Sequence, residues 1–280
     1  QKMVKAGRWE PNGGSWVEPD CKVIGSESLV RQFLVGQQAT KEMFGYRSDT
    51  FWMPDTFGYS AALPQILKGC GIDYFCTTKL AWNDTNRFPY DTFHWLGLDG
   101  TSVISHLNAM HGWPDPTTIT NTWKWVQHKD IQDRRLFAYG FGDGGGGPVR
   151  SMLEMVSREK DLEGIPRTRE MSVSEFMHGI ETDLKELPEY CGELYPEFHR
   201  GTLTSIHGVK RGNRLGEVAL RAAEMLCVRA AMAGAKYPAG ALGDLWKKLL
   251  INQFHDILPG TSIPEVNDQA ILELAEVCAE

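Results

Sequence analysis

Short apolar runs rich in β-branched and aromatic residues alternate with helical patterns over residues 45–180, and this alternation restricts the possible folds more than any other feature of the chain. Five runs are predicted to be strands: residues 50–53, 74–78, 102–107, 136–139 and 171–173. Between the first two, a short helix is predicted, with a cap at Ser60, Pro64 in its first turn and Gly69 at its end. The predicted fold class is therefore α/β, with a mainly parallel sheet or a (β/α) barrel, in which reactive side chains collect on the loops that follow the strands.

Strand patterns become rare after about residue 200, and long helical patterns replace them. Helices are predicted over residues 217–233 and 242–254, with a Pro-Ala-Gly break at residues 238–240 between them. We therefore predict two units, which are an α/β portion over residues 1–196 and a helical bundle over residues 197–280.

The charge balance excludes two broad classes of partner. The sequence has 29 Lys and Arg residues against 36 Asp and Glu residues, which gives a formal net charge of −7. Affinity for nucleic acid or for an anionic membrane surface requires clustered positive charge, so neither is predicted as a partner. No apolar run approaches the ~18 residues of a membrane span. The six cysteines are scattered without a C-x-x-C pair, which is typical of a reduced chain, so a cytoplasmic location is predicted.

Asp55 lies in an aromatic-rich loop, between the predicted strand 50–53 and the short helix that follows. Loops after strands hold the reactive groups of many α/β enzymes, and flanking aromatic rings can stack on a sugar or a base. The alternative is a Pro-Asp turn whose carboxylate only accepts hydrogen bonds from nearby backbone amides. The spacing alone leaves both interpretations open.

Asp143 lies in a glycine-rich loop after the predicted strand 136–139. Its neighbouring glycines leave the carboxylate unshielded and allow a ligand to approach the backbone. A phosphate-binding loop is disfavoured because no Gly-Lys-Ser/Thr follows and because an aspartate would repel phosphate. A dinucleotide fingerprint is a poor match, because Pro148 stands where a helix should begin. A surface loop without a function remains as the alternative.

His255 and Asp256 follow the predicted helix 242–254. An imidazole next to a carboxylate at a helix end can ligate a metal and hold a substrate hydroxyl, whereas the alternative is a structural histidine. Glu18 and Asp20 add carboxylates near the N-terminus. Two aspartates after different strands, in loops rich in Trp and Tyr, favour glycoside chemistry, which needs one carboxylate as nucleophile and a second group as acid and base.

Several long strings of residues occur in a fixed order along nearly the whole chain. They are Gly13-Gly14-Ser15-Trp16-Val17-Glu18-Pro19-Asp20, Glu27-Ser28-Leu29-Val30-Arg31-Gln32, Pro54-Asp55-Thr56-Phe57-Gly58-Tyr59-Ser60, Leu63-Pro64-Gln65-Ile66, Gly140-Phe141-Gly142-Asp143-Gly144 and Asn252-Gln253-Phe254-His255-Asp256. In these strings the chain resembles glycoside hydrolase family 38, the zinc-dependent class II α-mannosidases, and in particular the cytosolic and bacterial branch. The resemblance implies a substrate with a terminal α-mannoside and one zinc ion that holds its hydroxyls.

The resemblance also implies a role for five side chains. Asp55 takes the position of the family's catalytic nucleophile, which is also a zinc ligand, and His255 takes that of a later zinc ligand. Asp256 takes the position of a carboxylate that contacts the sugar. Lys79 takes that of a cation beside the nucleophile, which would keep Asp55 ionised. Asp143 takes the acid/base position, and because the family mechanism retains configuration, the Asp55 and Asp143 carboxylates are expected ~5–5.5 Å apart.

The sequence departs from the family's pattern in one large respect. The family begins with a strand that carries His-x-Asp and supplies two of four zinc ligands, and no such strand opens this chain. The chain also closes within an amphipathic pattern at residues 271–277 that has no Gly or Pro stop after it. We therefore predict an internal fragment, with a partial barrel that lacks its first strand. Catalytic zinc normally takes three protein ligands and a water, so Asp55 and His255 alone are expected to bind it weakly.

Three functions compete on this evidence. The first is a retaining α-mannosidase, of which this chain is a portion. The second is a catalytically inactive remnant that binds carbohydrate. The third, a nucleotide-binding module built on the glycine-rich loop at residues 140–147, is disfavoured for the reasons given above. Relatives in the family are often oligomers, so a homo-oligomer is compatible with the resemblance.

Overall fold

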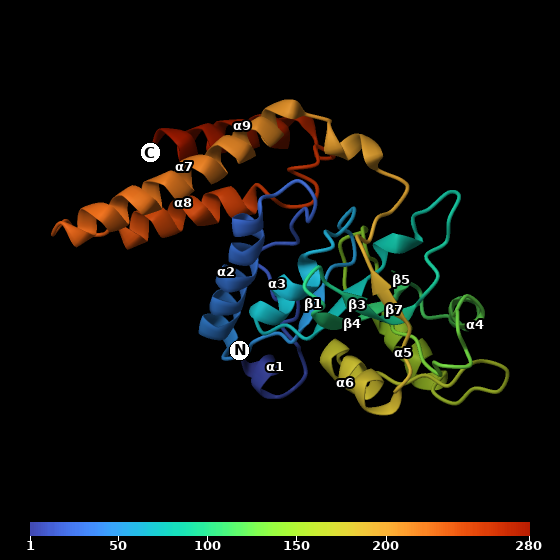
Figure 1. Cartoon of the computed structure of the whole chain (residues 1–280). Coiled ribbons are helices and arrows are strands. Elements are labelled where there is room, and N and C mark those ends of the chain that lie inside the picture. Colours follow the sequence, from blue (N-terminus) through green and yellow to red (C-terminus); the bar gives the residue numbers. More distant parts are fainter.

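A computed structural model gives the backbone of residues 1–280 and every side chain except those of Met110 and His111. The N-terminal part of the chain is built around a five-stranded sheet with the strand order β1-β2-β4-β3-β7 (Figure 1). The strands are β1 (Thr50–Trp52), β2 (Tyr74–Thr77), β3 (Thr92–Leu96), β4 (Ser102–Leu107) and β7 (Glu189–Cys191). Strands β1, β2 and β4 are parallel, whereas β3 returns antiparallel to β4. The carboxyl ends of β1 and β2 therefore open on the same edge of the sheet.

The core of this part is largely aromatic. Six of its aromatic side chains have no exposed surface: Phe33, Phe51, Tyr59, Phe75, Phe93 and Trp95. The ring centroids of Phe33 and Phe51, and those of Tyr59 and Phe75, are both 4.8 Å apart in edge-to-face arrangements. Such pairs add about 0.5–1.5 kcal/mol to what burial contributes. The first pair fixes β1 against the helix that carries Phe33, and the second fixes the turn after β1 against β2.

A smaller sheet continues from the first. Strand β5 (Ala109–Gly112) follows β4 after one residue and pairs in parallel with β6 (Phe137–Tyr139). The loop after β6 contains Asp143, so this loop leaves a strand in the same sense as the loops after β1 and β2.

Helices surround the two sheets. They are α1 (Lys2–Lys5), α2 (Ser26–Phe44), α3 (Leu63–Gly69), α4 (Pro116–Lys124), α5 (Arg150–Arg158) and α6 (Val173–Asp183), with 3-10 turns η1 (Lys79–Ala81) and η2 (Arg200–Leu203). Helix α2 has Glu27 in its first turn, where the negative charge suits the helix dipole. It ends at Gly45, whose φ of 71° requires the left-handed conformation that glycine adopts without strain.

The C-terminal part is an arm of three long helices, α7 (His207–Met232), α8 (Ala239–Ile251) and α9 (Pro264–Ala279) (Figure 1). The arm meets α2 at the base of α8. There the Arg31 guanidinium donates two hydrogen bonds to Glu224, at 2.9 and 2.7 Å, and stacks 4.0 Å from the ring centroid of Trp246. A bidentate and stacked arginine fixes the angle at which the arm leaves the α/β part.

Four of the five predicted strands are confirmed to within one residue, as β1, β2, β4 and β6. The prediction of a strand at residues 171–173 is wrong. The Ser172 side chain accepts a hydrogen bond from Glu175 N–H at 3.1 Å, and Glu10 accepts from Val173 N–H at 3.0 Å. These residues therefore begin helix α6 rather than a strand. Strands β3, β5 and β7 were not predicted.

The predicted helices are present with shifted limits. Helix α3 begins at Leu63, and Ser60 is not its cap, since the Ser60 hydroxyl only accepts from Ala62 N–H at 3.3 Å. Helix α7 begins at His207, ahead of the predicted residue 217. None of the helices that the structure describes is long and apolar enough to cross a membrane.

Candidate active site

Asp55 stands at the carboxyl end of β1, in a turn that is held at both ends. The Tyr59 hydroxyl lies 2.9 Å from the Met53 carbonyl oxygen and 2.8 Å from Thr77 Oγ1. Since the Tyr59 proton goes to the carbonyl, Thr77 donates to Tyr59. The turn that carries Asp55 is thereby tied to both β1 and β2.

Lys79, which follows β2, reaches the same turn. Its Nζ lies 2.5 Å from Asp55 Oδ1, and the residue is only 5% exposed. The Nζ also lies 4.9 Å from the ring centroid of Phe57 and 4.7 Å from that of Trp82. One carboxylate and two aromatic faces therefore compensate the mostly buried ammonium charge.

His255 comes from the far end of the sequence, in the loop between α8 and α9. Its backbone N–H and its ring Nδ1 both contact the Glu18 carbonyl oxygen, at 3.0 and 3.1 Å. A carbonyl oxygen only accepts, so Nδ1 is the donor and Nε2 is turned toward Asp55, 3.5 Å from its Oδ2. Asp256 Oδ2 lies 3.8 Å from the same Nε2, and the Glu18 carboxylate lies 3.6 Å from Nδ1.

Burial and charge act on these groups in opposite directions. Burial would raise the pKa of the Asp55 carboxyl, but hydrogen bonds from His255 and Lys79 outweigh it and lower that pKa to about 2. At Glu18 burial dominates and raises the pKa to about 7, and the nearby Asp55 and Asp256 charges add to the shift. Burial would lower the pKa of His255, but the surrounding carboxylates outweigh it and raise the pKa. The Asp55 carboxylate is thus held ionised, although two further carboxyl groups, those of Glu18 and Asp256, lie around the same imidazole.

Asp143 is not joined to this group. It is exposed, in a turn after β6 that is closed by a hydrogen bond from Phe141 N–H to the Gly146 carbonyl at 3.0 Å. None of the contacts between described residues links Asp143 to Asp55 or His255. The structure therefore brings together Asp55, Lys79, His255 and Asp256, and leaves Asp143 on a separate loop.

Comparisons with known proteins bear on the whole chain. Residues 1–193 match the model of the glycosyl hydrolases family 38 N-terminal domain, and residues 197–280 match that of the alpha mannosidase middle domain. The chain belongs to glycoside hydrolase family 38.

Its relatives in family 38 are considerably longer. The chain is 40% identical over 282 residues to "Alpha-mannosidase 2C1" of Homo sapiens, which covers 99% of this chain and 27% of that protein. It is 38% identical over 290 residues to "Alpha-mannosidase G" of Dictyostelium discoideum, which covers 100% of this chain and 27% of that protein. The crystal structure of an alpha-mannosidase from Enterococcus faecalis V583 shares its fold, with a TM-score of 0.79 at 19% identity over 99% of this chain and 33% of that one. The chain thus spans about a quarter of the length of these curated relatives.

The zinc ion that membership of family 38 implies fits two of the residues in this group. Two ligands of a tetrahedral zinc, each ~2.0–2.1 Å from the metal, lie about 3.3 Å from each other, and Asp55 Oδ2 and His255 Nε2 are 3.5 Å apart. The bond from Nδ1 to the Glu18 carbonyl is the arrangement by which proteins orient a ligating imidazole. Among the side chains that the structure describes, no group of three or more His, Cys, Asp and Glu residues is arranged to hold a metal ion. The fit therefore extends to a ligand pair and not to a full set.

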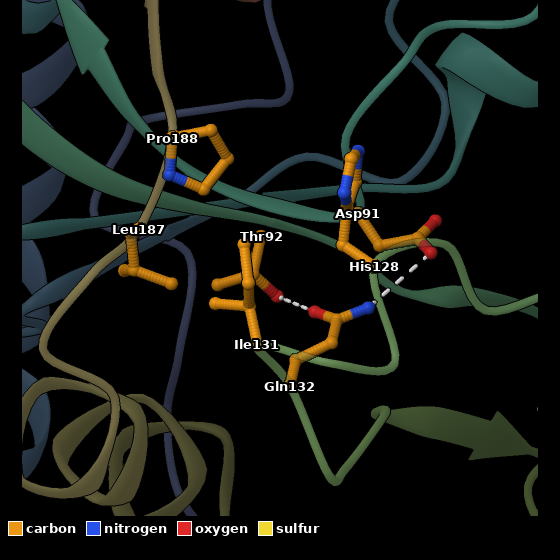
Figure 2. A pocket seen from close by; sticks show the side chains of 7 residues that line it. All are labelled: Asp91, Thr92, His128, Ile131, Gln132, Leu187 and Pro188. Atoms are coloured by element: carbon orange, nitrogen blue, oxygen red, sulfur yellow. Dashed lines mark hydrogen bonds between the residues drawn. The ribbon is translucent and has the colours of Figure 1, made fainter.

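A His-x-Asp spacing does occur within the sequence, at His128-Lys129-Asp130, but it belongs to a different part of the fold. His128 lines a small hollow beside β3 together with Thr92, Gln132 and Asp91 (Figure 2). The polar groups of this hollow bind one another, because Thr92 Oγ1 donates to Gln132 Oε1 at 2.5 Å and Gln132 Nε2 lies 3.4 Å from Asp91 Oδ2. The buried Asp91, Thr92 and Gln132 are therefore hydrogen-bonded to one another, whereas His128 is exposed and joins no group of candidate metal ligands among the described side chains.

Three side chains around the candidate site were not singled out from the sequence, although Phe57 belongs to the aromatic-rich loop of Asp55. They are Phe57 and Trp82, whose faces cover Lys79, and His199, whose ring centroid lies 4.6 Å from that of Phe57 and 5.7 Å from that of Trp82. The one available signal was that Phe57 and Trp82 are aromatic neighbours of predicted site residues. His199 comes from the segment before α7, and nothing local in the sequence marks it.

Proposed function

We propose that this chain provides the nucleophile and part of the zinc site of a retaining α-mannosidase, which releases terminal α-linked mannose from glycans or oligosaccharides. The observation that carries the proposal is the distance of 3.5 Å between Asp55 Oδ2 and His255 Nε2, two residues that lie far apart in the sequence. The α-mannosidase names of the relatives support the reaction class.

The reaction would proceed in two balanced steps. In the first, an Asp55 oxygen bonds to the anomeric carbon while the bond to the leaving oxygen breaks, and Asp143 gives its proton to that oxygen. In the second, water attacks the same carbon, Asp143 takes a proton from the water, and the bond to Asp55 breaks. Two inversions at one carbon retain the configuration. Lys79 supports the first step because its contact with Asp55 keeps the nucleophile ionised.

Asp55 and His255 would hold the zinc ion, which supplies a Lewis acid that orients the hydroxyls of the bound mannose. Asp256, whose carboxylate lies beside the same imidazole, would accept a hydrogen bond from the sugar. The Phe57 and Trp82 rings would form an apolar wall next to the ring of the substrate.

The test compares two aspartates that are each paired with a lysine. Asp55 pairs with Lys79 in the site, and Asp73 pairs with Lys68 at 2.6 Å on the surface. We expect zinc- or cobalt-dependent release of nitrophenol from 4-nitrophenyl α-mannoside by the unaltered chain. Asp55→Asn should lower kcat/KM by about 10⁴-fold or more, and Asp73→Asn should change it by no more than about twofold. Turnover that survives in Asp55→Asn would contradict the proposal, and the absence of metal-dependent release by the unaltered chain would favour binding without turnover, the alternative that follows.

A second candidate function is carbohydrate binding without turnover. It is favoured by the finding that only a pair of candidate ligands, among the described side chains, meets at Asp55. Calorimetric titration with mannose separates the two functions, because this alternative requires heat of binding without any release of nitrophenol in the presence of zinc.

A further inference from the structure

The segment that contains Glu18 and Pro19 contacts one candidate zinc ligand, His255, and the residue next to the other, Asp55. The Glu18 carbonyl accepts hydrogen bonds from the N–H and the Nδ1 of His255, at 3.0 and 3.1 Å. The next carbonyl, that of Pro19, accepts from the Thr56 hydroxyl at 3.0 Å, and Thr56 directly follows Asp55. Two consecutive carbonyls of one backbone segment therefore set the imidazole against the turn that carries the carboxylate.

Gln253, two residues before His255, holds the second chain segment in place. Its carbonyl accepts from Asp20 N–H at 2.8 Å, and the residue has no exposed surface. Its side-chain oxygen accepts from Gln32 Nε2 at 3.1 Å, and its side-chain nitrogen donates to Asn213 Oδ1 at 2.8 Å. The buried side-chain amide of Gln253 thus connects α2 with α7, and the backbone carbonyl of the same residue holds the segment before α2.

Glu217 of α7 completes this network. It is 4% exposed, and its Oε1 lies 3.3 Å from Gln253 Nε2. The same oxygen accepts from Gly25 N–H at 2.7 Å and from Ser28 Oγ at 2.9 Å, at the start of α2. Arg214 pairs with its second oxygen at 2.6 Å, so the buried charge is compensated. The network locks the helical arm to the α/β part next to the candidate site.

We propose that Gln253 is a positioning residue for the zinc site, which holds the backbone of His255 on the Glu18 carbonyl so that Nε2 faces Asp55 before any cation binds. The inference rests on the proposed function, since it assigns a use to the pair formed by Asp55 and His255. A ligand pair that folding has already aligned binds a metal more tightly than one that must be ordered on binding. Residues that orient a metal ligand from behind typically change metal affinity about 10–100-fold.

The experiment compares Gln253→Met with a control at the adjacent residue, Asn252→Leu. Asn252 is 2% exposed, and its side-chain nitrogen donates to the Lys248 carbonyl at 2.9 Å and to Glu273 Oε2 at 2.8 Å. Both variants delete a buried amide, but the Asn252 contacts stay within the arm. The Kd for cobalt, measured by absorption titration, should rise at least about tenfold in Gln253→Met and stay within about twofold in Asn252→Leu. The midpoint of thermal unfolding should fall in both.

A metal-independent measurement separates this inference from the proposed function. In ¹⁵N NMR of the imidazoles, the His255 Nδ1 proton should exchange slowly with solvent in the unaltered chain and in Asn252→Leu, and rapidly in Gln253→Met. If slow exchange persists in Gln253→Met, or if its Kd for cobalt equals that of the unaltered chain, the inference is overturned. If the unaltered chain binds no cobalt while the exchange pattern is as expected, the zinc function fails and the positioning of His255 stands. Should Gln253→Met not fold, Gln32→Met removes the contact on α2, and unchanged exchange there overturns the inference equally.

Discussion

Two loops of the α/β part each carry an aspartate after a strand, and they are built in opposite ways. The Asp55 turn is fixed by the buried Tyr59 hydroxyl and faces a lysine and an imidazole. The Asp143 loop is exposed, and it is closed by its own backbone, from Phe141 N–H to the Gly146 carbonyl. Tertiary contacts therefore determine the direction of the first carboxylate, whereas the conformation of a glycine-rich turn determines the direction of the second. A nucleophile that also holds a metal needs the first arrangement, because its geometry must be set before the substrate arrives.

The largest expected effect is the loss of turnover when either aspartate is replaced, and the response to azide then distinguishes the two carboxylates. Asp143→Asn should lower kcat/KM about 10²–10⁴-fold, because a proton donor and acceptor is lost. Azide attacks without the help of a base, so it should restore turnover in this variant and release mannosyl azide with the configuration retained. Asp55→Asn loses the atom that bonds to the sugar, and azide should not restore this product. NMR of the products decides, and full activity of Asp143→Asn would assign the acid/base role to another group.

A matched pair of Tyr→Phe variants tests the difference in structural support. Tyr59→Phe removes the Tyr59 hydrogen bond to the buried Met53 carbonyl and leaves the Thr77 hydroxyl with only the bond that it accepts from Lys79 N–H, so the free energy of unfolding should fall by about 1–3 kcal/mol. Tyr139→Phe, at the start of the Asp143 loop, removes only a 2.7 Å bond to Glu170 at a partly exposed position. It should cost less than about 1 kcal/mol in urea unfolding. Equal losses would show that the two loops are supported alike.

Acid should weaken the side of the molecule that carries Asp143. His106 of β4 is fully buried, and its Nε2 accepts from Leu136 N–H, just before β6, at 3.2 Å. Burial, with a smaller effect of the Arg135 charge, lowers the pKa of His106 to about 3. The unfolded chain, with a histidine pKa of ~6.5, therefore takes up the proton first as the pH falls. The contribution of His106 to stability is complete above about pH 6.5 and is lost progressively toward pH 3.

At about pH 5 this linkage should reduce the free energy of unfolding by about 2 kcal/mol relative to neutral pH. Urea unfolding of the unaltered chain and of His106→Asn at both pH values measures it. The variant should show a smaller decrease on acidification, and an identical decrease in both proteins would rule out His106 as the cause.

The smallest expected effect comes from two glycines, one in each loop. Gly58, near Asp55, has a φ of 135°, and an added Cβ would lie 3.3 Å from the Leu194 carbonyl oxygen. Gly58→Ala should therefore cost about 1 kcal/mol or more. Gly147, in the other loop, has no atom within 4 Å of such a Cβ, and Gly147→Ala should stay within about 0.5 kcal/mol of the original stability. Thermal unfolding of both variants measures the two stability losses. If Gly58→Ala is as stable as the unaltered chain, the two loops do not differ in this respect.

The fold was predictable where strands are buried on both faces. Residues 102–107 form β4 with the predicted limits, as a central strand in which all residues but the first are buried, although Ser105 and His106 interrupt its apolar run. Residues 171–173 mimic such a run, but there Ser172 caps a helix. Strand β3 was missed although Gly97 and Gly100 mark the turn of its hairpin with β4. Strand β7, with the sequence Glu-Tyr-Cys and two exposed residues, contains no apolar run that could have marked it.

The candidate site was predictable only in part. Residue patterns left Asp55 between a catalytic role and a turn, and the family resemblance singled out His255 as its partner. The ring of His199 and the backbone carbonyl of Glu18 joined the group only in three dimensions, because a backbone contact leaves no mark on the identity of a residue. The catalytic roles of Asp55 and Asp143, and the division of the chain near residue 196, remain predictions.

The stacked and doubly bonded Arg31 at the foot of the helical arm has a mechanical consequence. The guanidinium joins α2 to both α7 and α8, and His255 follows α8 after a short turn, so this contact restricts how far the arm can tilt against the α/β part. Fraying of the arm at its far end should therefore leave His255 beside Asp55. Loss of the Arg31 contacts would free the arm from this part of α2, whereas the bonds of Gln253 and Glu217 would still oppose a separation of His255 from Asp55.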